Sequence, residues 1–423
     1  MIFFTTMKVQ MPKMKSSTTR PFFKFLVASL CLVFLTTGCS LTKKIGSPNS
    51  SGNWAVANSG AATGQPKIVV PTAAPLEIMK AAKNSTALLA RAVTSLGDNR
   101  APKFSPDGSK LLFLSSGRPS HKQAQVYELD LLRMTERRVT FHDGDDEGAN
   151  WDTNSRLVYS SVTDELKEDV SLERIKSVYE ASKNAAANPN GMRQPPKIVN
   201  GGDVYLQRLD GRAIERITNH SGPDVSPTAS GSPRASKIVF VSSRLGDPRL
   251  FLASGSSARP ISHGPDASPA FNSDGKSLAW ERTVPSTDQK APAQSQIFMT
   301  ENLRSAEPLT APGFHDQQPA WSGKSDVVVF SSNRGDGRSD GRSDGRTDGR
   351  TDGKSFNLFS IDRKASCLKR LTEVQVDLFW PTMSPDGSKI AFSTKVNGQN
   401  QIYLMEDRSA TRPCVTVPSS SDH

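Results

Sequence analysis

The chain has 423 residues, of which 22% are charged and 35% hydrophobic, so it is long enough for one large domain or two ordinary ones and too apolar to be wholly disordered. The 30 glycines and 28 prolines make up about 14% of the chain, which excludes a collagen-like or low-complexity protein. The formal charge of +11 raises the question of a polyanionic partner.

The first 38 residues have the organisation of a secretory signal. Residues 1–24 carry five basic residues and no acidic one. The apolar run that follows, residues 25–37, is shorter than the roughly 20 residues that a membrane-spanning helix needs. A basic segment, a short apolar segment and small residues at the end predict a signal peptide that is removed.

The end of this signal resembles the lipobox of bacterial lipoproteins. Residues 35–39 read LTTGC, with Thr36 in the place of the more usual leucine. The resemblance implies that Cys39 is lipidated and becomes the first residue of the mature protein, and Ser40 implies sorting to the outer membrane. The alternative is an ordinary secretory signal that contains a cysteine by chance.

Removal of the signal lowers the net charge of the chain and the number of cysteines that could form a disulfide. The mature chain keeps 48 basic and 42 acidic residues, a net charge of +6, and has no zinc-finger spacing, so no nucleic-acid partner is predicted. Of the 4 cysteines, Cys31 leaves with the signal and Cys39 carries the lipid. Cys367 and Cys414 remain in an oxidising compartment, either as a disulfide or as two separate thiols.

Two segments lie between the lipidation site and the repeats. Residues 39–75 are rich in serine, glycine, alanine, asparagine and proline, which predicts a flexible tether. Residues 76–92 are compatible with a short helix or with a strand that leads into Val93 and Thr94.

From about residue 93 the chain repeats itself. Each unit has a short apolar segment that ends in an aromatic residue, and these aromatic residues are Phe113, Tyr159, Phe240, Trp280, Phe330 and Phe392. A turn precedes the segment, most clearly in residues 104–110 (FSPDGSK) and 383–389 (MSPDGSK), where proline and Asp-Gly are typical of a tight turn between strands.

Each unit continues with another strand and then closes with an apolar residue followed by threonine or serine. The closing pairs are Val139-Thr140, Ile217-Thr218, Ile261-Ser262, Leu309-Thr310 and Leu371-Thr372. About four short strands in each 40–50 residues are typical of a β-propeller blade. The sequence therefore predicts an all-β fold, a six-bladed β-propeller over residues 76–416 with a tail at 417–423.

Two insertions lengthen the units. Residues 164–200 have apolar residues at helical spacing, which predicts a short helical insertion in blade 2. Residues 335–354 repeat Gly-Arg-Ser/Thr-Asp, which predicts a low-complexity loop. Its Gly-x-Ser-x-Gly match lacks the strand–turn–helix context of a hydrolase nucleophile, and no catalytic residue is predicted.

The pattern D-x-x-P-x-[aromatic]-S-P-D-G-x-x-[apolar]-A-F, followed by I-Y-x-M and L-T, resembles the repeat of TolB-type propellers over residues 93 to about 407. The resemblance implies a periplasmic six-bladed propeller that acts as a protein-binding platform of the cell envelope. The chain departs from that family in its lipobox and in having too few residues at 40–92 for the α/β domain that precedes the propeller there.

Two segments compete for the strand that closes the ring. Val415-Thr416 follows Tyr403 at the spacing seen in the other units, and Val93-Thr94 leads into the first unit as the other closing pairs lead into theirs. We prefer closure by the N-terminal segment for the second reason.

An acidic residue precedes the proline of each unit, and these residues are Asp98, Asp146, Asp224, Asp266, Asp316 and Asp377. Equivalent positions in six blades would gather them near the mouth of the central channel, where close carboxylates create a negative potential. This predicts a site for a basic peptide or for a cation such as Ca²⁺. The alternative is that each aspartate accepts hydrogen bonds within its own turn.

Four histidines fall in the same loops: His142, His220, His263 and His315. Gathered near the axis, they would be candidate ligands of a transition metal, and the alternative is that histidine is simply common in this loop of the repeat. Residues 143–154 begin like an EF-hand loop, but Asn154 stands where that loop needs a glutamate.

Together these patterns predict a monomeric lipoprotein on the periplasmic side of the outer membrane. It would bind an envelope protein or peptide and touch the membrane only through its lipid, without enzymatic activity and with no cofactor beyond Ca²⁺ at the channel mouth. The alternative function is a metal-dependent envelope enzyme, a propeller lyase or hydrolase of polysaccharides, that uses the channel mouth lined by histidine and aspartate.

Overall fold

The computed structural model describes residues 67–68, 73–79, 88–163, 202–211, 213–231, 236–255, 257–285, 293–323, 326–334 and 355–415, all within the compact unit Ala57–His423. The predicted signal, Cys39, the inserted segment 164–200, the loop 335–354 and the tail 417–423 lie outside the described residues. What the sequence predicts for them, the helical insertion in blade 2 included, stays a prediction.

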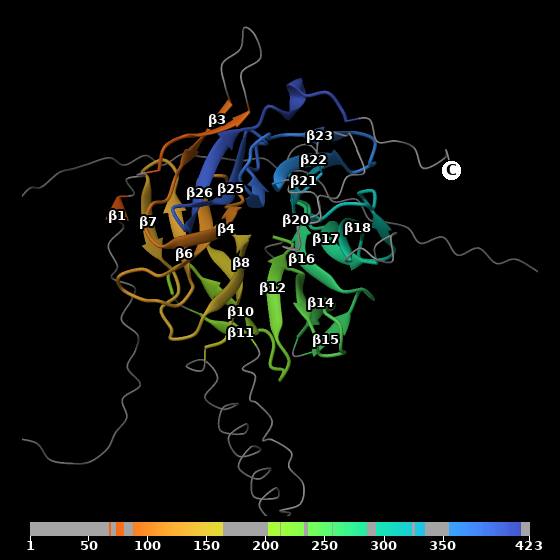
Figure 1. The fold of residues 1–423 in the computed structure, drawn as a ribbon. Coiled ribbons are helices and arrows are strands. Elements are labelled where there is room, and N and C mark those ends of the chain that lie inside the picture. The colour runs from red at the N-terminus through yellow and green to blue at the C-terminus, as the bar shows by residue number, and fades with distance from the viewer. Residues whose placement is uncertain are drawn as a thin grey trace, which may run out of the picture. The chain divides into compact units, whose positions relative to one another are not determined.

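Six antiparallel sheets follow one another along the chain, and each sheet is one blade of a propeller (Figure 1). From the inside outward, blade 1 consists of β4 (Asp98–Phe104), β5 (Lys110–Ser116), β6 (Gln125–Asp130) and β7 (Thr135–Arg138). Blade 2 consists of β8 (Asp146–Thr153), β9 (Arg156–Ser161), β10 (Asp203–Arg208) and β11 (Glu215–Arg216). Blade 3 consists of β12 (Asp224–Ala229), β13 (Ile238–Ser242), β14 (Arg249–Ser254) and β15 (Ser257–Pro260).

The second half of the ring has the same organisation. Blade 4 consists of β16 (Asp266–Phe271), β17 (Ser277–Val284), β18 (Gln294–Glu301) and β19 (Ala306–Pro308). Blade 5 consists of β20 (Asp316–Trp321), β21 (Val327–Ser332), β22 (Asn357–Asp362) and β23 (Leu368–Arg370). Blade 6 begins with β24 (Leu378–Met383), β25 (Lys389–Val396) and β26 (Gln399–Glu406). Each inner strand contacts the inner strand of the next blade, and β24 contacts β4, so the ring is closed around a central channel.

The N-terminal segment completes blade 6. Strand β3 (Leu88–Ala92) pairs antiparallel with β26, and β2 (Leu76–Met79) pairs with β3. The backbone N–H of Val93 donates to the carbonyl of Ile402 over 2.8 Å. The preferred closure by the N-terminal side is therefore confirmed, and the alternative of a helix is wrong for the described parts of residues 76–92.

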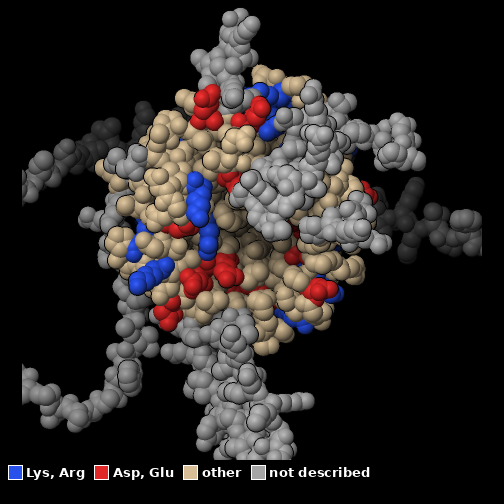
Figure 2. Space-filling view, in the orientation of Figure 1, with Lys and Arg blue, Asp and Glu red and all other residues tan. Residues whose placement is uncertain are grey.

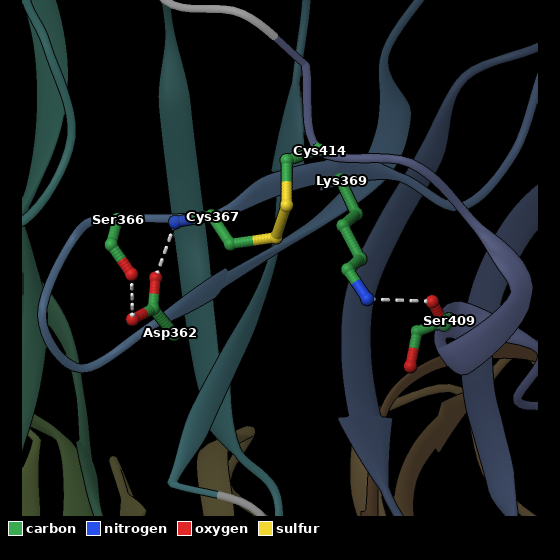
Figure 3. Close-up of a disulfide and its surroundings, with 6 residues drawn as sticks. All are labelled: Asp362, Ser366, Cys367, Lys369, Ser409 and Cys414. Atoms are coloured by element: carbon green, nitrogen blue, oxygen red, sulfur yellow. Dashed lines mark hydrogen bonds between the residues drawn. A yellow bond between two sulfur atoms is a disulfide. The ribbon is translucent and has the colours of Figure 1, made fainter.

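The C-terminal segment binds to a different blade. Val415 forms an isolated antiparallel bridge with Leu368 at the outer edge of blade 5. Cys414 beside it forms a disulfide with Cys367, with their Cα atoms 5.1 Å apart (Figure 3). Of the two cysteine states that the sequence left open, the structure has the disulfide. It fastens the end of the described chain to β23.

The tether predicted for residues 39–75 contains one described strand. Strand β1 (Lys67–Ile68) pairs with β7 and becomes the fifth strand of blade 1. The only helical element among the described residues is the 3₁₀ turn η1 (Ser409–Thr411), and no helix in this part of the chain has the length and apolar character of a membrane span.

The repeated residues have repeated structural roles. The aromatic marker of each unit lies on the second strand of its blade, is almost fully buried, and in all six blades packs against an aromatic ring of the third strand, as in Phe330 against Phe359. The turn at residues 105–110 is closed by the hydroxyl of Ser105, which donates to Asp107 over 2.6 Å and accepts from the N–H of Lys110. Ser384 and Asp386 repeat this turn in blade 6.

The closing threonine or serine forms the same hydrogen bond in all six blades. Its hydroxyl oxygen accepts a hydrogen bond from a backbone N–H of the third strand, over 2.8 to 3.0 Å. The six hydroxyls belong to Thr94, Thr140, Thr218, Ser262, Thr310 and Thr372. This bond satisfies a buried N–H at the point where the outer strand turns away.

Candidate functional site at the central channel

The six predicted acidic residues all lie where an inner strand begins. Five are the first residues of β4, β8, β12, β16 and β20, and Asp377 directly precedes β24. Because the blades repeat one strand order around the ring, these positions mark one end of the channel, which we call the entrance end. The opposite end, where the inner strands finish in the turns around residues 105–108, 272–275 and 384–387, is the turn end.

In blades 3, 4 and 5 the acid is fully paired inside its own blade. Arg244 donates to both oxygens of Asp224 over 2.7 and 2.9 Å, and Arg282 holds Asp266 in the same way over 2.7 and 3.2 Å. In blade 5 Arg334 donates hydrogen bonds to both oxygens of Asp316. These carboxylates are almost completely removed from solvent, so each arginine balances a buried negative charge.

Each of these arginines also lies over aromatic rings. The guanidinium of Arg282 is 4.5 Å from the ring centre of Phe298, and that of Arg334 is 4.5 Å from Phe314. Arg244 lies 4.9 Å from Phe251. Guanidinium groups stack well on aromatic faces, and the stacking fixes the orientation in which the fork meets the carboxylate.

In blades 1 and 6 the acid at the entrance end has a partner other than arginine. In blade 1 the corresponding arginine, Arg118, lies over Tyr127 and pairs with Glu136 of the outer strand, while also donating to Asn99 over 3.1 Å. Asp98 is half-buried and accepts from the side chain of Asn400. Asp377 is half-buried and accepts from the N–H of Phe356 over 2.9 Å.

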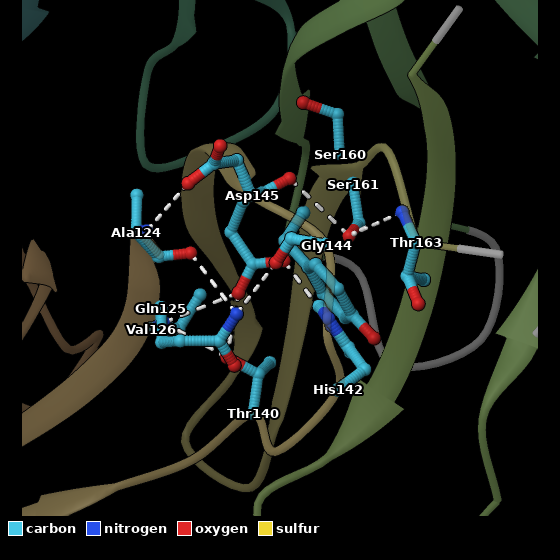
Figure 4. A network of polar contacts seen from close by, with 12 residues as sticks. Ala124, Gln125, Val126, Thr140, His142, Gly144, Asp145, Ser160, Ser161 and Thr163 are labelled. Atoms are coloured by element: carbon cyan, nitrogen blue, oxygen red, sulfur yellow. Dashed lines mark hydrogen bonds and ion pairs between the residues drawn. The ribbon is translucent and has the colours of Figure 1, made fainter. Parts of the chain in front are cut away.

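In blade 2 a histidine replaces the arginine. Figure 4 shows the network around it, with His142 and Thr140 near the backbone of Val126. One oxygen of Asp146 accepts from the hydroxyl of Thr140 over 2.6 Å, and Nε2 of His142 lies 3.2 Å from the other. The imidazole stacks on Tyr159 with the planes 10° apart, as the arginines stack on aromatic rings in other blades.

The other histidines lie in the loops before the inner strands of blades 3, 4 and 5. His220 accepts from the N–H of Gly222 through Nδ1, His263 is exposed, and the N–H of His315 donates to Asn333. Within the part of the chain that the structure describes, no three His, Cys, Asp or Glu side chains are grouped so that they could hold a metal ion. The binding roles of the six acids and of the four histidines stay predictions.

The residues that face the channel follow the acids, directly in blades 2 to 5 and after one further residue, Asn99 or Leu378, in blades 1 and 6. In blades 3 to 6 the inner strand is buried at its first residue, half-buried at the next two and buried or nearly so afterwards. A β-bulge lies at this point in all six inner strands and re-aims the side chains. We call these residues the channel pairs: Arg100 and Ala101, Glu147 and Gly148, Val225 and Ser226, Ala267 and Ser268, Gln317 and Gln318, Phe379 and Trp380.

The second residue of every channel pair has a positive φ, between 50° and 69°. Five of the six are not glycine, so each holds a backbone conformation that costs on the order of 1–3 kcal/mol unless its surroundings compensate. At Trp380 the compensation is visible, because its N–H donates to the side chain of Gln318 over 2.7 Å. Phe356, Phe379 and Trp380 form a connected aromatic cluster, with ring centres 5.2 and 5.8 Å apart.

One acid at the channel is unusual. Glu281 directly follows the aromatic marker of blade 4, a position at which blades 2, 5 and 6 have serine, and it accepts from the N–H of Gln318 over 3.3 Å. Burial raises its pKa to about 7, and the nearby charge of Asp316 adds to this, against hydrogen bonds from Gln318 and Ser268 that lower it.

Sequence reasoning found the acids and missed their arginine partners. The signal was present, because arginine follows a serine pair in three units, as Ser115-Ser116-Gly117-Arg118, Ser242-Ser243-Arg244 and Ser331-Ser332-Asn333-Arg334. Glu281 also stands out, because no other unit has a charged residue directly after its aromatic marker.

Comparison with known proteins gives one sequence relative and several similar solved structures. No protein-family model matches the chain. A curated TolB homolog from Chlorobium luteolum is 28% identical over 155 residues, which is 36% of this chain and 25% of that protein. The match therefore spans about a quarter of the relative's length.

The solved structures that resemble this chain do so at low sequence identity. The putative TolB from Agrobacterium tumefaciens is 17% identical, covers 75% of this chain and 93% of its own, and has a TM-score of 0.46. TolB from Acinetobacter baumannii is 15% identical, with 76% and 60% covered and a TM-score of 0.41. An oligogalacturonate lyase in complex with manganese is 16% identical, with 82% and 99% covered and a TM-score of 0.46. The predicted resemblance to TolB-like propellers is confirmed by the sequence relative and by the six-bladed ring of this chain.

Proposed function

We propose that the chain is a lipid-anchored periplasmic propeller that binds a protein or peptide of the cell envelope at the entrance end of its channel. The observation that carries the proposal is the set of channel pairs. They bring aromatic, basic, acidic and amide side chains together on a rigid ring, and mixed aromatic and polar surfaces are typical of protein-binding hot spots.

The charge pattern supports the same site. Figure 2 shows Asp and Glu side chains grouped near the middle of the visible face, with Lys and Arg side chains beside them. In blades 3, 4 and 5 the buried acids are already balanced by arginine. The charged members of the channel pairs that can meet a partner are the exposed Glu147 and the half-buried Arg100. A peptide with charges of both signs suits this surface better than a purely basic one.

The experiment is a pull-down from bacterial envelope extracts with the mature protein as bait. We expect Trp380→Ala and Glu147→Lys each to weaken capture of a specific partner at least tenfold, because each changes a channel pair without removing a buried ion pair. Leu132→Ala is the matched control, since Leu132 is 88% exposed on the hairpin between β6 and β7. Equal capture by all four proteins would contradict a site at the entrance end.

The anchor is tested separately. Cys39→Ser should abolish incorporation of labelled palmitate and move the protein from the membrane fraction to the periplasmic fraction, without changing its binding to the partner. Palmitate incorporation into the Cys39→Ser protein would contradict lipidation at this residue.

The second candidate function, a metal-dependent enzyme that acts on a polysaccharide, rests on the histidines of the same end. Among the described residues, His142 contacts Asp146 and stacks on Tyr159. The other three histidines do not form a metal-binding group with it. Metal analysis of the purified protein is the measurement that would favour this function, through stoichiometric zinc or manganese lost in a His220→Ala variant.

A further inference from the structure

The turn end of the channel contains a cavity that the proposed function does not use. Its volume is about 270 Å³, and all six blades contribute to its lining. This is just below the roughly 300–1,000 Å³ of typical small-molecule sites and well above the space of a single water molecule. Apolar walls come from Phe271, Trp321 and Met383, among others.

The walls of this cavity are held by contacts between the turns of neighbouring blades. The N–H of Asp107 donates to the side chain of Asn154 over 3.1 Å, and the hydroxyl of Ser273 donates to the carbonyl of Gly323 over 3.4 Å. A Cβ on Gly323 would lie 2.3 Å from the carbonyl oxygen of Pro385 and would clash, so blades 5 and 6 touch there through backbone. The cavity is therefore part of a rigid ring and is largely pre-formed.

Lys103 is the cation of this cavity. It lies on β4 of blade 1, its backbone carbonyl accepts from the indole N–H of Trp151, and among the described residues its ammonium has no hydrogen bond or ion pair. The arginines described above in blades 1, 3, 4 and 5, by contrast, are each paired with a carboxylate. Loss of solvent contact alone lowers the pKa of Lys103 to about 8, with no neighbouring charge contributing. The charged ammonium form is therefore less favoured here than in water.

The charges around Lys103 leave a net positive cavity. On the neighbouring strand β8, Asp152 lines the cavity, but its charge is balanced by Arg156. The other packed inner strand, β24, carries no ionisable side chain, and on β4 itself Asp98 and Arg100 lie toward the entrance end. Lys103 is half-buried, and its unpaired ammonium at an aromatic-walled cavity makes a site that an anion with an apolar body would complete.

We propose that the turn-end cavity binds a small carboxylate with an apolar or aromatic body, whose carboxylate pairs with the ammonium of Lys103. This site lies at the opposite end of the channel from the proposed protein-binding site and does not depend on it. Binding would replace the missing counter-ion of Lys103 and place the apolar body against Phe271 and Trp321.

Titration calorimetry with benzoate tests the proposal on the mature protein at pH 7. We expect saturable binding to the wild type and at least a tenfold weaker affinity for Lys103→Met, since one charge-assisted bond is lost. Lys276→Met is the matched control, because Lys276 is exposed in a turn of the same end and should leave the affinity unchanged. No saturable binding to the wild type, or equal affinity in Lys103→Met, would overturn the proposal.

Two further measurements keep the test independent of folding defects. The thermal midpoint of Lys103→Met should be no lower than that of the wild type, because the variant removes an unpaired charge at a half-buried position. Benzoate affinity of the wild type should fall about tenfold for each pH unit above about 8, as Lys103 loses its proton. Affinity that stays constant up to pH 10 would show that the ammonium is not the counter-ion.

Discussion

Arg334 and Asp316 lie almost completely out of solvent, and each is the charge partner of the other in blade 5. Removing only one of them leaves a buried charge without compensation, which costs on the order of 3–5 kcal/mol. We expect Arg334→Met to lower the free energy of unfolding by about 3 kcal/mol in urea titrations. The double variant Arg334→Met/Asp316→Asn should recover part of that loss.

An exposed pair provides the control for this prediction. Arg133 and Asp130 form an ion pair over 2.8 Å in the turn after β6, but Arg133 is 73% exposed. Arg133→Met should therefore change the urea midpoint little, because solvent screens such pairs. If the two arginine variants had equal effects, burial would not be the reason for the stability of the Arg334 pair.

Glu281 makes the stability of the propeller depend on pH near neutrality. Its pKa is raised to about 7 in the folded protein, above the ordinary value of 4.5, so between these values the folded state keeps a proton that the unfolded state has lost. The free energy of unfolding then falls as pH rises, by up to about 1.4 kcal/mol per unit in that window. Glu281→Gln removes this dependence and keeps an acceptor for the N–H of Gln318.

Urea titrations at pH 5 and pH 8 measure this effect. The gain in stability of Glu281→Gln over the wild type should be larger at pH 8 than at pH 5, because the wild-type carboxylate is ionised only at the higher pH. Ser393→Ala, at the corresponding position of blade 6, should show no such pH dependence. An equal gain at both pH values would contradict a raised pKa at Glu281.

The acids of the entrance end could be located from sequence, because five of the six precede a proline by three or four residues and Asp146 fills the same place in its unit. Their environment could not, because burial and pairing depend on which residue the second strand brings across the blade. Asp224 lies three residues before its proline and Asp377 four, yet one is buried under Arg244 and the other accepts from the N–H of Phe356 at a half-buried position.

At the scale of strands, the closing threonine explains why the repeat keeps a hydroxyl at that place. The hydroxyl of Thr372 accepts from the N–H of Leu358 and donates to Asn357, each over 2.9 Å. Thr372→Val has nearly the same shape but leaves that N–H and the Asn357 oxygen without this partner, and we expect a loss of about 1–3 kcal/mol in the free energy of unfolding.

Thr372→Ser is the matched variant, because Ser262 fills the same role in blade 3 with an N–H to oxygen distance of 2.8 Å. It should retain most of the stability in the same urea titrations. A loss in Thr372→Ser as large as that in Thr372→Val would mean that the methyl group, and not the hydroxyl, matters here.

Recurring strands were readable from sequence because each blade repeats its own local rules: an aromatic residue on the second strand, an Asp-Gly turn and a closing hydroxyl. The disulfide was not decided by those rules. Whether Cys414 reaches Cys367 depends on where residues 407–413 lead the chain after the last blade, and the path toward β23 is set by contacts such as that of Lys369 with the carbonyl of Ser409 over 2.9 Å (Figure 3).

At the scale of the whole molecule, the ring is held closed by a segment far from the rest of its blade in sequence. Ile78, Leu88, Ala90 and Ala92 of β2 and β3 are buried in the same core as Tyr403 and Met405 of β26. The sequence named both candidates for this strand, and only long-range pairing could decide between them. The Val415 segment joins blade 5, so it does not offer a second strand to β26.

A chain that begins at residue 95 therefore loses the outer part of blade 6. It gives up the burial of Ile78 and Leu88, worth about 1.5–3 kcal/mol each, and exposes the edge of β26, which can pair with another chain. We expect this protein to unfold at lower urea concentration than the mature protein and to associate in size-exclusion chromatography. A chain that begins at residue 70 loses only β1 and should behave as the mature protein does. If the chain from residue 95 were monomeric and equally stable, β2 and β3 would not be what closes the propeller.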